Sequence, residues 1–171
     1  VLFEAMHTGH SVYATVHADS TSETIQRLIN PPIEVPPNLL KAVNLNVVMF
    51  RDRRRGIRRT YQIGEFTTSE ESGKSTVKPN ILYRWKPSTD KIVPHGSSVR
   101  LFEDLSRHTG MSLSEINNDL KIKVNILTYM VNNKIRDVES VGKIMNDYYQ
   151  DHDSLIASIT RNAKPKEILG L

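Results

Sequence analysis

Residues 45–67 read LNVVMFRDRRRGIRRTYQIGEFT, and this stretch decides how the first half of the chain folds. Residues 45–50 form a nearly continuous apolar run, and residues 58–67 are rich in β-branched and aromatic side chains, which is typical of strands. Gly56 lies in the turn between the two runs. The pattern predicts a β-hairpin whose tip and flanks carry arginines.

The positive charge of the chain is concentrated in this hairpin. Residues 51–59 hold six arginines and Asp52, a net charge of +5, whereas all 171 residues together carry +4. The basic character is therefore one patch, not a property of the whole surface. Such a patch suits nucleic acid, an acidic partner or phosphates at a subunit boundary, or it discourages edge-to-edge aggregation. No aromatic pair interleaves the arginines, which argues against a platform for single-stranded nucleic acid.

Local patterns before the hairpin predict short elements. Residues 1–6 (VLFEAM) predict a helix that ends at Gly9, and residues 11–16 (SVYATV) predict a short buried strand. The next helix has a capping box at Ser20 and Glu23, an apolar face of Ile25, Leu28 and Ile29, and a stop at Pro31-Pro32. Pro36-Pro37 opens a further short helix.

Beyond the hairpin we expect a change from strands to helices. Residues 67–79 predict a polar loop, residues 80–86 a strand and residues 91–93 a short return strand. From residue 99 the patterns are helical. The predicted helices cover residues 101–109, a long helix capped by Ser112 and Glu115 with an apolar stripe of Ile116, Leu120, Val124, Leu127 and Val131, and residues 137–149 and 154–161. The expected organisation is an α/β part over residues 1–98 and an all-helical part over residues 99–171.

Composition excludes several classes of protein. Hydrophobic residues make up 38% and charged residues 25% of the chain, which suffices for a folded core. No cysteine is present, so disulfides, thiol nucleophiles and cysteine-ligated metals are excluded. No apolar run reaches the ~18 residues of a membrane span, and no signal peptide opens the chain. The sequence also begins inside a helix pattern without an initiator Met, so we expect the C-terminal part of a longer, cytosolic protein.

Three short motifs favour ordinary structure over chemistry. Residues 71–75 (ESGKS) end like a phosphate-binding loop, but Thr68 stands where that loop needs glycine, which indicates a solvated loop. His7, His10 and His17 are spaced across a Thr-Gly turn, and we predict no metal site there. Residues 109–112 resemble the turn of a helix-turn-helix, yet residues 99–133 carry four basic and four acidic side chains. Without a basic footprint, an ordinary helical corner is favoured.

The stretch Thr8-Gly9-His10, a short strand and Thr15-Val16-His17 resembles the histidine box of secretion-superfamily ATPases, the ring motors of secretion, type IV pili and the archaellum. The resemblance continues through residues 24–28 (TIQRL), the Pro31-Pro32 bend and the arginine hairpin. Residues 131–137 and 145–149 of the C-terminal helices resemble the archaeal branch.

This resemblance implies a RecA-like ATPase domain whose phosphate-binding and acidic motifs lie upstream of Val1. The resemblance implies that His17 and His10 are the catalytic candidates. His17 would polarise the γ-phosphate, and His10 would support His17 from the start of the same strand. The resemblance also implies a hexameric ring whose neighbouring subunits are contacted by arginines. These candidate interface residues are Arg27, Arg53, Arg54, Arg55, Arg58 and Arg59. An open alternative for the histidines is a satisfied side chain at each end of a buried strand.

The expected function is therefore the C-terminal portion of a hexameric motor ATPase that powers secretion or pilus or archaellum assembly. ATP and Mg²⁺ would be its cofactors, bound only in the longer protein, because this chain lacks a phosphate-binding loop. The expected partner is a membrane platform protein, with the motor peripheral to the inner face of the membrane and no nucleic acid bound. The alternative is a non-enzymatic nucleic-acid-binding module that uses the arginine hairpin and the helical corner.

Overall fold

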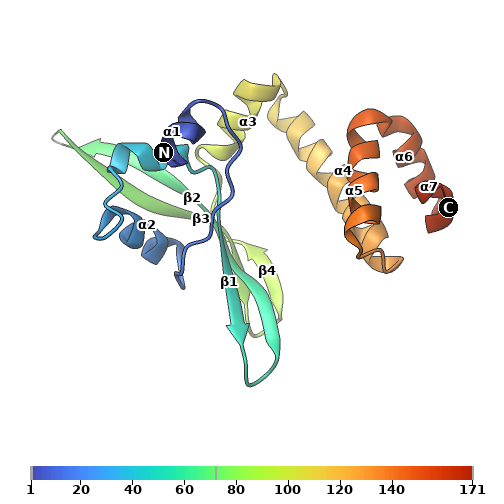
Figure 1. Ribbon diagram of the computed structural model, residues 1–171, viewed down its shortest axis with the longest axis horizontal. Helices are drawn as coiled ribbons and strands as arrows, with labels where there is room; N and C mark the ends of the chain where they lie inside the picture. Colours follow the sequence, from blue (N-terminus) through green and yellow to red (C-terminus); the bar gives the residue numbers. More distant parts are fainter. Residues whose placement is uncertain (1, 72, 171) are drawn as a thin grey trace. The chain divides into compact units, whose positions relative to one another are not determined.

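A four-stranded antiparallel sheet is the centre of the first half of the chain (Figure 1). The computed structural model describes residues 2–71 and 73–170. The strand order is β1-β2-β3-β4, so each strand pairs with its neighbour in sequence. Their bounds are β1 Asn46–Asp52, β2 Ile57–Glu71, β3 Lys74–Lys86 and β4 Lys91–Pro94. The predicted hairpin and the mixed α/β class are both confirmed.

The β1–β2 hairpin closes through a turn that the sequence specifies locally. Asp52 pairs with Ile57 across the ladder, and its carboxylate accepts a hydrogen bond from the backbone N–H of Arg55 at 3.1 Å. Gly56 has a φ of +66°, a conformation that glycine adopts at little steric cost. The three arginines between Asp52 and Gly56 therefore lie at the tip of the ribbon.

The sheet is longer than predicted, and the polar loop expected over residues 67–79 is wrong. Residues 67–71 complete β2 and residues 74–79 begin β3, with Thr67 opposite Lys78 and Ser69 opposite Thr76. The Ser69 and Thr76 hydroxyls lie 2.8 Å apart, a cross-strand pair that stabilises a ladder without apolar side chains. Gly73 lies in the hairpin turn and is followed by a strand, not by the helix that a phosphate-binding loop requires.

Two helical segments pack against the sheet and form the first core. They are α2 Thr21–Ile29, as the capping pattern predicts, and the 3₁₀ helix η1 Pro37–Ala42. The backbone N–H of Thr21 donates to Gln62 Oε1 of β2 at 3.1 Å, which ties the start of α2 to the sheet. The buried core residues are Ile25, Leu28, Val35, Leu40 and Phe66.

The strand predicted over residues 11–16 does not form. These residues follow α1 Leu2–His7 and pair with no strand of the described sheet. Tyr13 is 98% exposed, so the segment is not buried either. β-branched and aromatic residues suit a pleated surface, but a strand also needs a neighbour to share its ladder hydrogen bonds. The described residues provide no such neighbour.

A buried carboxylate fixes the start of α3 Leu101–Thr109 to the sheet. Glu65 on β2 is fully buried and accepts hydrogen bonds from the backbone N–H groups of Val99 at 2.6 Å and Leu101 at 2.8 Å. The Asn80 amide and the Ser98 hydroxyl also donate to it, at 2.8 and 3.0 Å. A carboxylate at these free N–H groups serves as the helix cap, although it comes from a distant strand.

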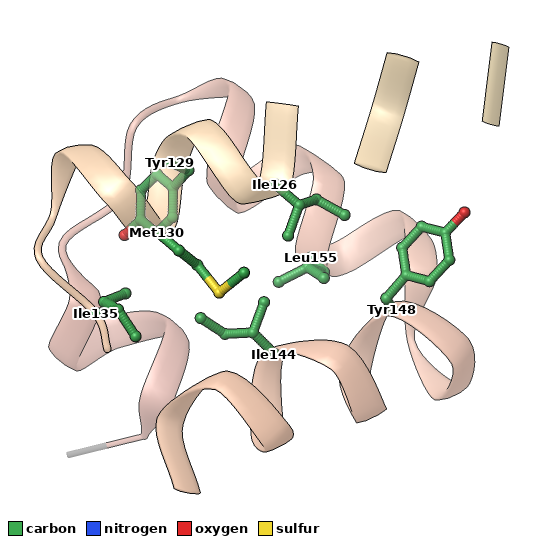
Figure 2. Packing of buried hydrophobic residues seen from close by; sticks show 7 residues of the cluster. All are labelled: Ile126, Tyr129, Met130, Ile135, Ile144, Tyr148 and Leu155. Carbon is green, nitrogen blue, oxygen red and sulfur yellow. The ribbon is translucent and has the colours of Figure 1, made fainter. Parts of the chain in front are cut away.

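Two compact units divide between His108 and Thr109, so α3, the first of the predicted C-terminal helices, lies in the first unit. The second unit is helical: α4 Leu113–Asn132, α5 Val138–Gln150, α6 His152–Thr160 and α7 Pro165–Leu169. Figure 2 shows Ile126, Met130, Ile144 and Leu155 pointing toward one another in its core. The capping box of Ser112 and Glu115 is confirmed, whereas α7 was not predicted.

The predicted apolar stripe of α4 is largely wrong. Ile116 is buried, but Leu120, Val124, Leu127 and Val131 are exposed, with exposed fractions from 43% to 68%. The core is instead formed by Ile126, Tyr129 and Met130 from another face of the helix. α4 is apolar on two faces, and helical periodicity alone does not say which face its neighbours cover.

Candidate functional site

The turn after α1 positions His10. Gly9 has a φ of +87°, and the backbone N–H of His10 donates to Ala5 O at 3.0 Å, so the helix ends as the sequence predicts. The Thr8 hydroxyl lies 3.1 Å from His10 Nδ1 and 3.0 Å from Ala5 O. The His10 ring is therefore exposed but held against the end of α1.

His17 lies at the opposite end of the same segment, just before α2. Its side chain is exposed. Ser20 caps α2 by accepting from the Glu23 N–H at 3.0 Å, and Glu23 reaches back to the N–H of Asp19 at 2.7 Å. These two hydrogen bonds fix the backbone immediately after His17.

Arg27, the next candidate, is already engaged within α2. Its guanidinium lies 2.7 Å from Glu23 Oε1, one helical turn away. The hydrogen bond from the Asp19 N–H, together with the Arg27 guanidinium, lowers the pKa of Glu23. The side chains of Arg27 and Glu23 are 52% and 36% exposed, so water screens the pair, which orients Arg27 and contributes little to stability.

A cavity of about 970 Å³ brings His17 and Arg27 to one site. Its lining comes from α1, residues 11–19, α2, residues 43–49 and Phe66. His10 and the hairpin arginines are not among these lining residues. The size is that of a site for a small molecule or a peptide segment. Several apolar side chains along it are exposed, including Val47 at 50% and Met49 at 64%.

The hairpin arginines do not form one equivalent set. Arg53, Arg54, Arg55 and Arg58 are exposed. Arg59 instead makes a two-pronged pair with Asp90 beside β4, with Nε–Oδ1 and NH2–Oδ2 distances of 2.6 Å. Hydrogen bonds from Arg59 and then from the Trp85 indole lower the pKa of Asp90 to about 2. Arg59 therefore has a partner within its own chain, whereas the other four contact no carboxylate among the described residues.

Two buried or partly buried polar clusters were not predicted. The first is Glu65 with its donors, described above; its sequence signal is an acidic residue beside Gly64 and Phe66 in a strand. The second joins α4, α5 and α6, where the Tyr148 hydroxyl donates to Asp119, and Lys123 Nζ lies 2.7 Å from the same carboxylate. The Tyr148 ring contacts His152 edge-on, with centroids 5.1 Å apart. Burial, followed by this hydrogen bond, raises the pKa of Tyr148.

Residues 2–71 and 73–170 contain no group of three or more His, Asp or Glu side chains arranged to hold a metal ion. None of their helices is long and apolar enough to cross a membrane. The site therefore consists of a histidine and an arginine at a partly apolar cavity, with a second histidine outside it.

The chain is similar to three uncharacterized proteins of the archaeon Methanocaldococcus jannaschii. It is 32% identical to one over 157 residues, which cover 88% of this chain and 28% of that protein. It is 31% identical to the second over 147 residues, covering 85% and 20%, and 29% identical to the third over 154 residues, covering 89% and 56%. The chain thus spans between a fifth and just over half of the length of these relatives. No model of a known protein family matches it.

Proposed function

We propose that the chain is the C-terminal portion of a hexameric motor ATPase of the secretion superfamily, which drives secretion or pilus or archaellum assembly. The proposal rests on three sequence features that follow one another in the chain: Thr8-Gly9-His10, Thr15-Val16-His17 and Arg27. The second and third of these features line one cavity. In this proposal the antiparallel sheet and α2 belong to a RecA-like domain that polypeptide outside residues 1–171 completes.

The unpaired segment of residues 11–17 supports this assignment. A segment with strand composition, exposed on both sides, suits a position between strands of a larger sheet. Exposed apolar side chains along the cavity, such as Val47 and Met49, suit burial against the same missing neighbour. The greater length of all three relatives leaves room for that part of the domain.

The chemistry would be divided between the two parts of the domain. The chain has no G-x-x-x-x-G-K-[ST] motif, so the loop that holds the β- and γ-phosphates and Mg²⁺ belongs to the other part. His17 would donate a hydrogen bond to the γ-phosphate, where imidazole responds to the change in charge during hydrolysis. His10 would support the segment from its other end through the Thr8 contact. Residues 1–171 alone should not hydrolyse ATP.

Arginines would complete the site between subunits of the ring. The exposed Arg53, Arg54, Arg55 and Arg58 are free to face a neighbouring subunit. Arg27 lies at the cavity and is paired with Glu23 of its own helix. Arg59 is a weaker candidate, because Asp90 already neutralises it. A guanidinium supplied by a neighbour at the transferred phosphate accelerates hydrolysis by ~10³–10⁵. The motor would act at the inner face of the membrane through a platform protein.

The test is ATP turnover by the full-length protein carrying His17→Ala. We expect turnover to fall by about 10²-fold, the usual effect of removing one donor to the developing charge, while a fluorescent ATP analogue still binds. His7→Ala is the matched control, because His7 is an exposed histidine ten residues earlier that no motif includes. Unchanged turnover in His17→Ala would contradict the catalytic role of His17, and a full-length protein without ATPase activity would contradict the proposed function.

A further inference from the structure

One end of the sheet is far more basic than the rest of the chain. This basic end consists of residues 49–63 and 81–94, which together hold nine arginines and lysines and two aspartates, a net charge of +7. The whole chain carries +4, so all other residues sum to −3. Figure 1 shows the β1–β2 hairpin projecting at this end with β4 beside it, away from α2.

Most of this charge is not neutralised by the residues that the structure describes. Arg59 pairs with Asp90, and Arg84 donates to the Tyr61 hydroxyl at 3.1 Å. In the part of the chain that the structure describes, the other five hairpin guanidinium groups contact no carboxylate. These are Arg51, Arg53, Arg54, Arg55 and Arg58. Arginine rather than lysine at every position favours the two-pronged binding of phosphate or carboxylate oxygens.

Aromatic side chains from three strands meet on one face of the sheet, close to the turn that carries Arg53, Arg54 and Arg55. Arg51 and Arg58 pair across the ladder next to Phe50 and therefore lie on the opposite face. The Phe50 ring lies 5.3 Å from Trp85 and 6.4 Å from Tyr61, measured between centroids. The Arg84 guanidinium lies 5.6 Å over the Tyr61 ring. Phe50 remains 37% exposed and Tyr83 44%. The sequence argument against a stacking platform is that no aromatic pair interleaves the arginines. In the structure, rings from three different strands meet close to the hairpin turn, so that argument does not hold.

We propose that the basic end binds single-stranded nucleic acid, with the hairpin arginines on phosphates and the exposed aromatic rings on bases. Positive charge that follows the backbone, combined with aromatic faces for the bases, is the general basis of such binding. The proposal does not require ATP hydrolysis, and it differs from the expectation that no nucleic acid binds. It assigns Arg53, Arg54, Arg55 and Arg58 to nucleic acid, whereas the proposed motor assigns them to a neighbouring subunit, so the two proposals compete for these four side chains.

The geometry favours a linear polyanion over a flat anionic surface. Phe50 lies on β1 two residues before the strand ends at Asp52, about 7 Å along the ribbon at ~3.3 Å per residue, and Arg53, Arg54 and Arg55 lie in the turn beyond that end. A membrane that touches the tip of the hairpin would contact the arginines and leave these rings in water. A nucleic-acid strand lying along the ribbon would reach both the phosphate-binding and the stacking groups.

The first test is binding of a fluorescein-labelled 20-nucleotide oligo(dT) by the full-length protein without ATP, followed by anisotropy at increasing salt. Each phosphate contact should contribute about −0.7 to the slope of log affinity against log salt. The triple variant Arg53→Ala, Arg54→Ala, Arg55→Ala should bind at least about tenfold more weakly and lose about 2 from the slope.

A charge-matched variant controls for net charge. Lys121→Ala, Lys164→Ala, Lys166→Ala removes three exposed cations from the helical unit and should leave affinity unchanged. Phe50→Ala should weaken binding about tenfold through lost stacking, whereas Phe50→Tyr should retain it.

Three results would overturn the proposal. They are no binding at ~50 mM salt, where electrostatic binding is strongest, equal losses in the two triple variants, and binding to vesicles with a quarter phosphatidylglycerol but not to oligo(dT). ATP turnover measured on the same variants is a separate readout, so failure here leaves the proposed function standing.

Discussion

Two stretches of this chain have the composition of strands, and only one of them forms strands. Residues 45–67 fold into the β1–β2 hairpin because each run finds its partner across a four-residue turn. Residues 11–16 are equally rich in β-forming side chains, yet they pair with nothing in the described part of the sheet. Side-chain preference makes a segment suitable for a β-strand, but the strand forms only where a partner strand is available to pair with it.

We expect the largest effect on the free energy of unfolding from substitutions that compare the paired sheet with the unpaired segment of residues 11–16. Phe66 on β2 has no exposed surface and packs in the core with Ile25 and Leu40. Phe66→Ala should lower the free energy of unfolding by about 3–5 kcal/mol. Tyr13→Ala should change it by less than about 0.5 kcal/mol, since Tyr13 is 98% exposed. Urea unfolding followed by circular dichroism measures both, and a large loss in Tyr13→Ala would show that residues 11–16 are packed.

A smaller effect should come from the carboxylate that ties the sheet to α3. Glu65→Gln keeps the shape of the side chain but replaces one of its two acceptor oxygens with an NH2 donor, so the N–H group of either Val99 or Leu101 loses its acceptor. We expect a loss of about 1–3 kcal/mol by the same urea assay. Glu115→Gln, at the exposed capping box of α4, is the control and should cost less.

The same carboxylate predicts a pH dependence with a definite sign. Burial raises the pKa of Glu65, but the hydrogen bonds from Val99, Leu101, Asn80 and Ser98 outweigh burial and leave the pKa below its usual value. Its contribution is therefore complete above the unfolded-state pKa of about 4.3 and is lost as the pH falls through the folded value. Stability that falls with pH equally in wild type and Glu65→Gln would contradict this account.

We expect the smallest effect in the fluorescence of Trp85, which lies on β3 beside the β1–β2 hairpin. Trp85 is the only tryptophan of the chain, and its indole N–H donates to Asp90 Oδ1 at 2.9 Å. Asp90→Asn removes the charge that holds both Trp85 and Arg59, so the emission of Trp85 should shift with little change in stability. In wild type the same shift should appear on acidification near pH 2, because the pKa of Asp90 is lowered to about 2. Emission that is identical in both proteins would show that this pair does not persist in solution.

The sequence predicts the elements that depend on neighbouring residues and does not predict those that depend on a distant partner. The hairpin, the cap of α2 at Ser20 and the capping box at Ser112 depend on residues close together in the chain, and these predictions are confirmed. The extension of β2 and β3 through residues 67–79 was missed, because hydroxyl pairs across a ladder have no apolar period. The covered face of α4 was missed because it depends on where α5 and α6 pack.

The candidate site follows the distinction as well. His17 and Arg27 could be selected from the sequence because the motif is local, and the structure places both on one cavity. Three other contacts join residues more than 30 positions apart in the chain. They are the hydrogen bond from Val99 to Glu65, the Arg59–Asp90 pair and the contact of Phe50 with Trp85. No local sequence pattern predicts such contacts, because they form only when the strands have paired in the correct register.

We propose that residues 8–19 are one part of a nucleotide site that polypeptide outside residues 1–171 completes. The decisive experiment is amide hydrogen exchange of residues 11–17, compared between residues 1–171 alone and the full-length protein with a non-hydrolysable ATP analogue. The account predicts fast exchange in the chain alone and strong protection in the full-length protein, because the segment then gains ladder hydrogen bonds. Equally fast exchange in both would contradict it.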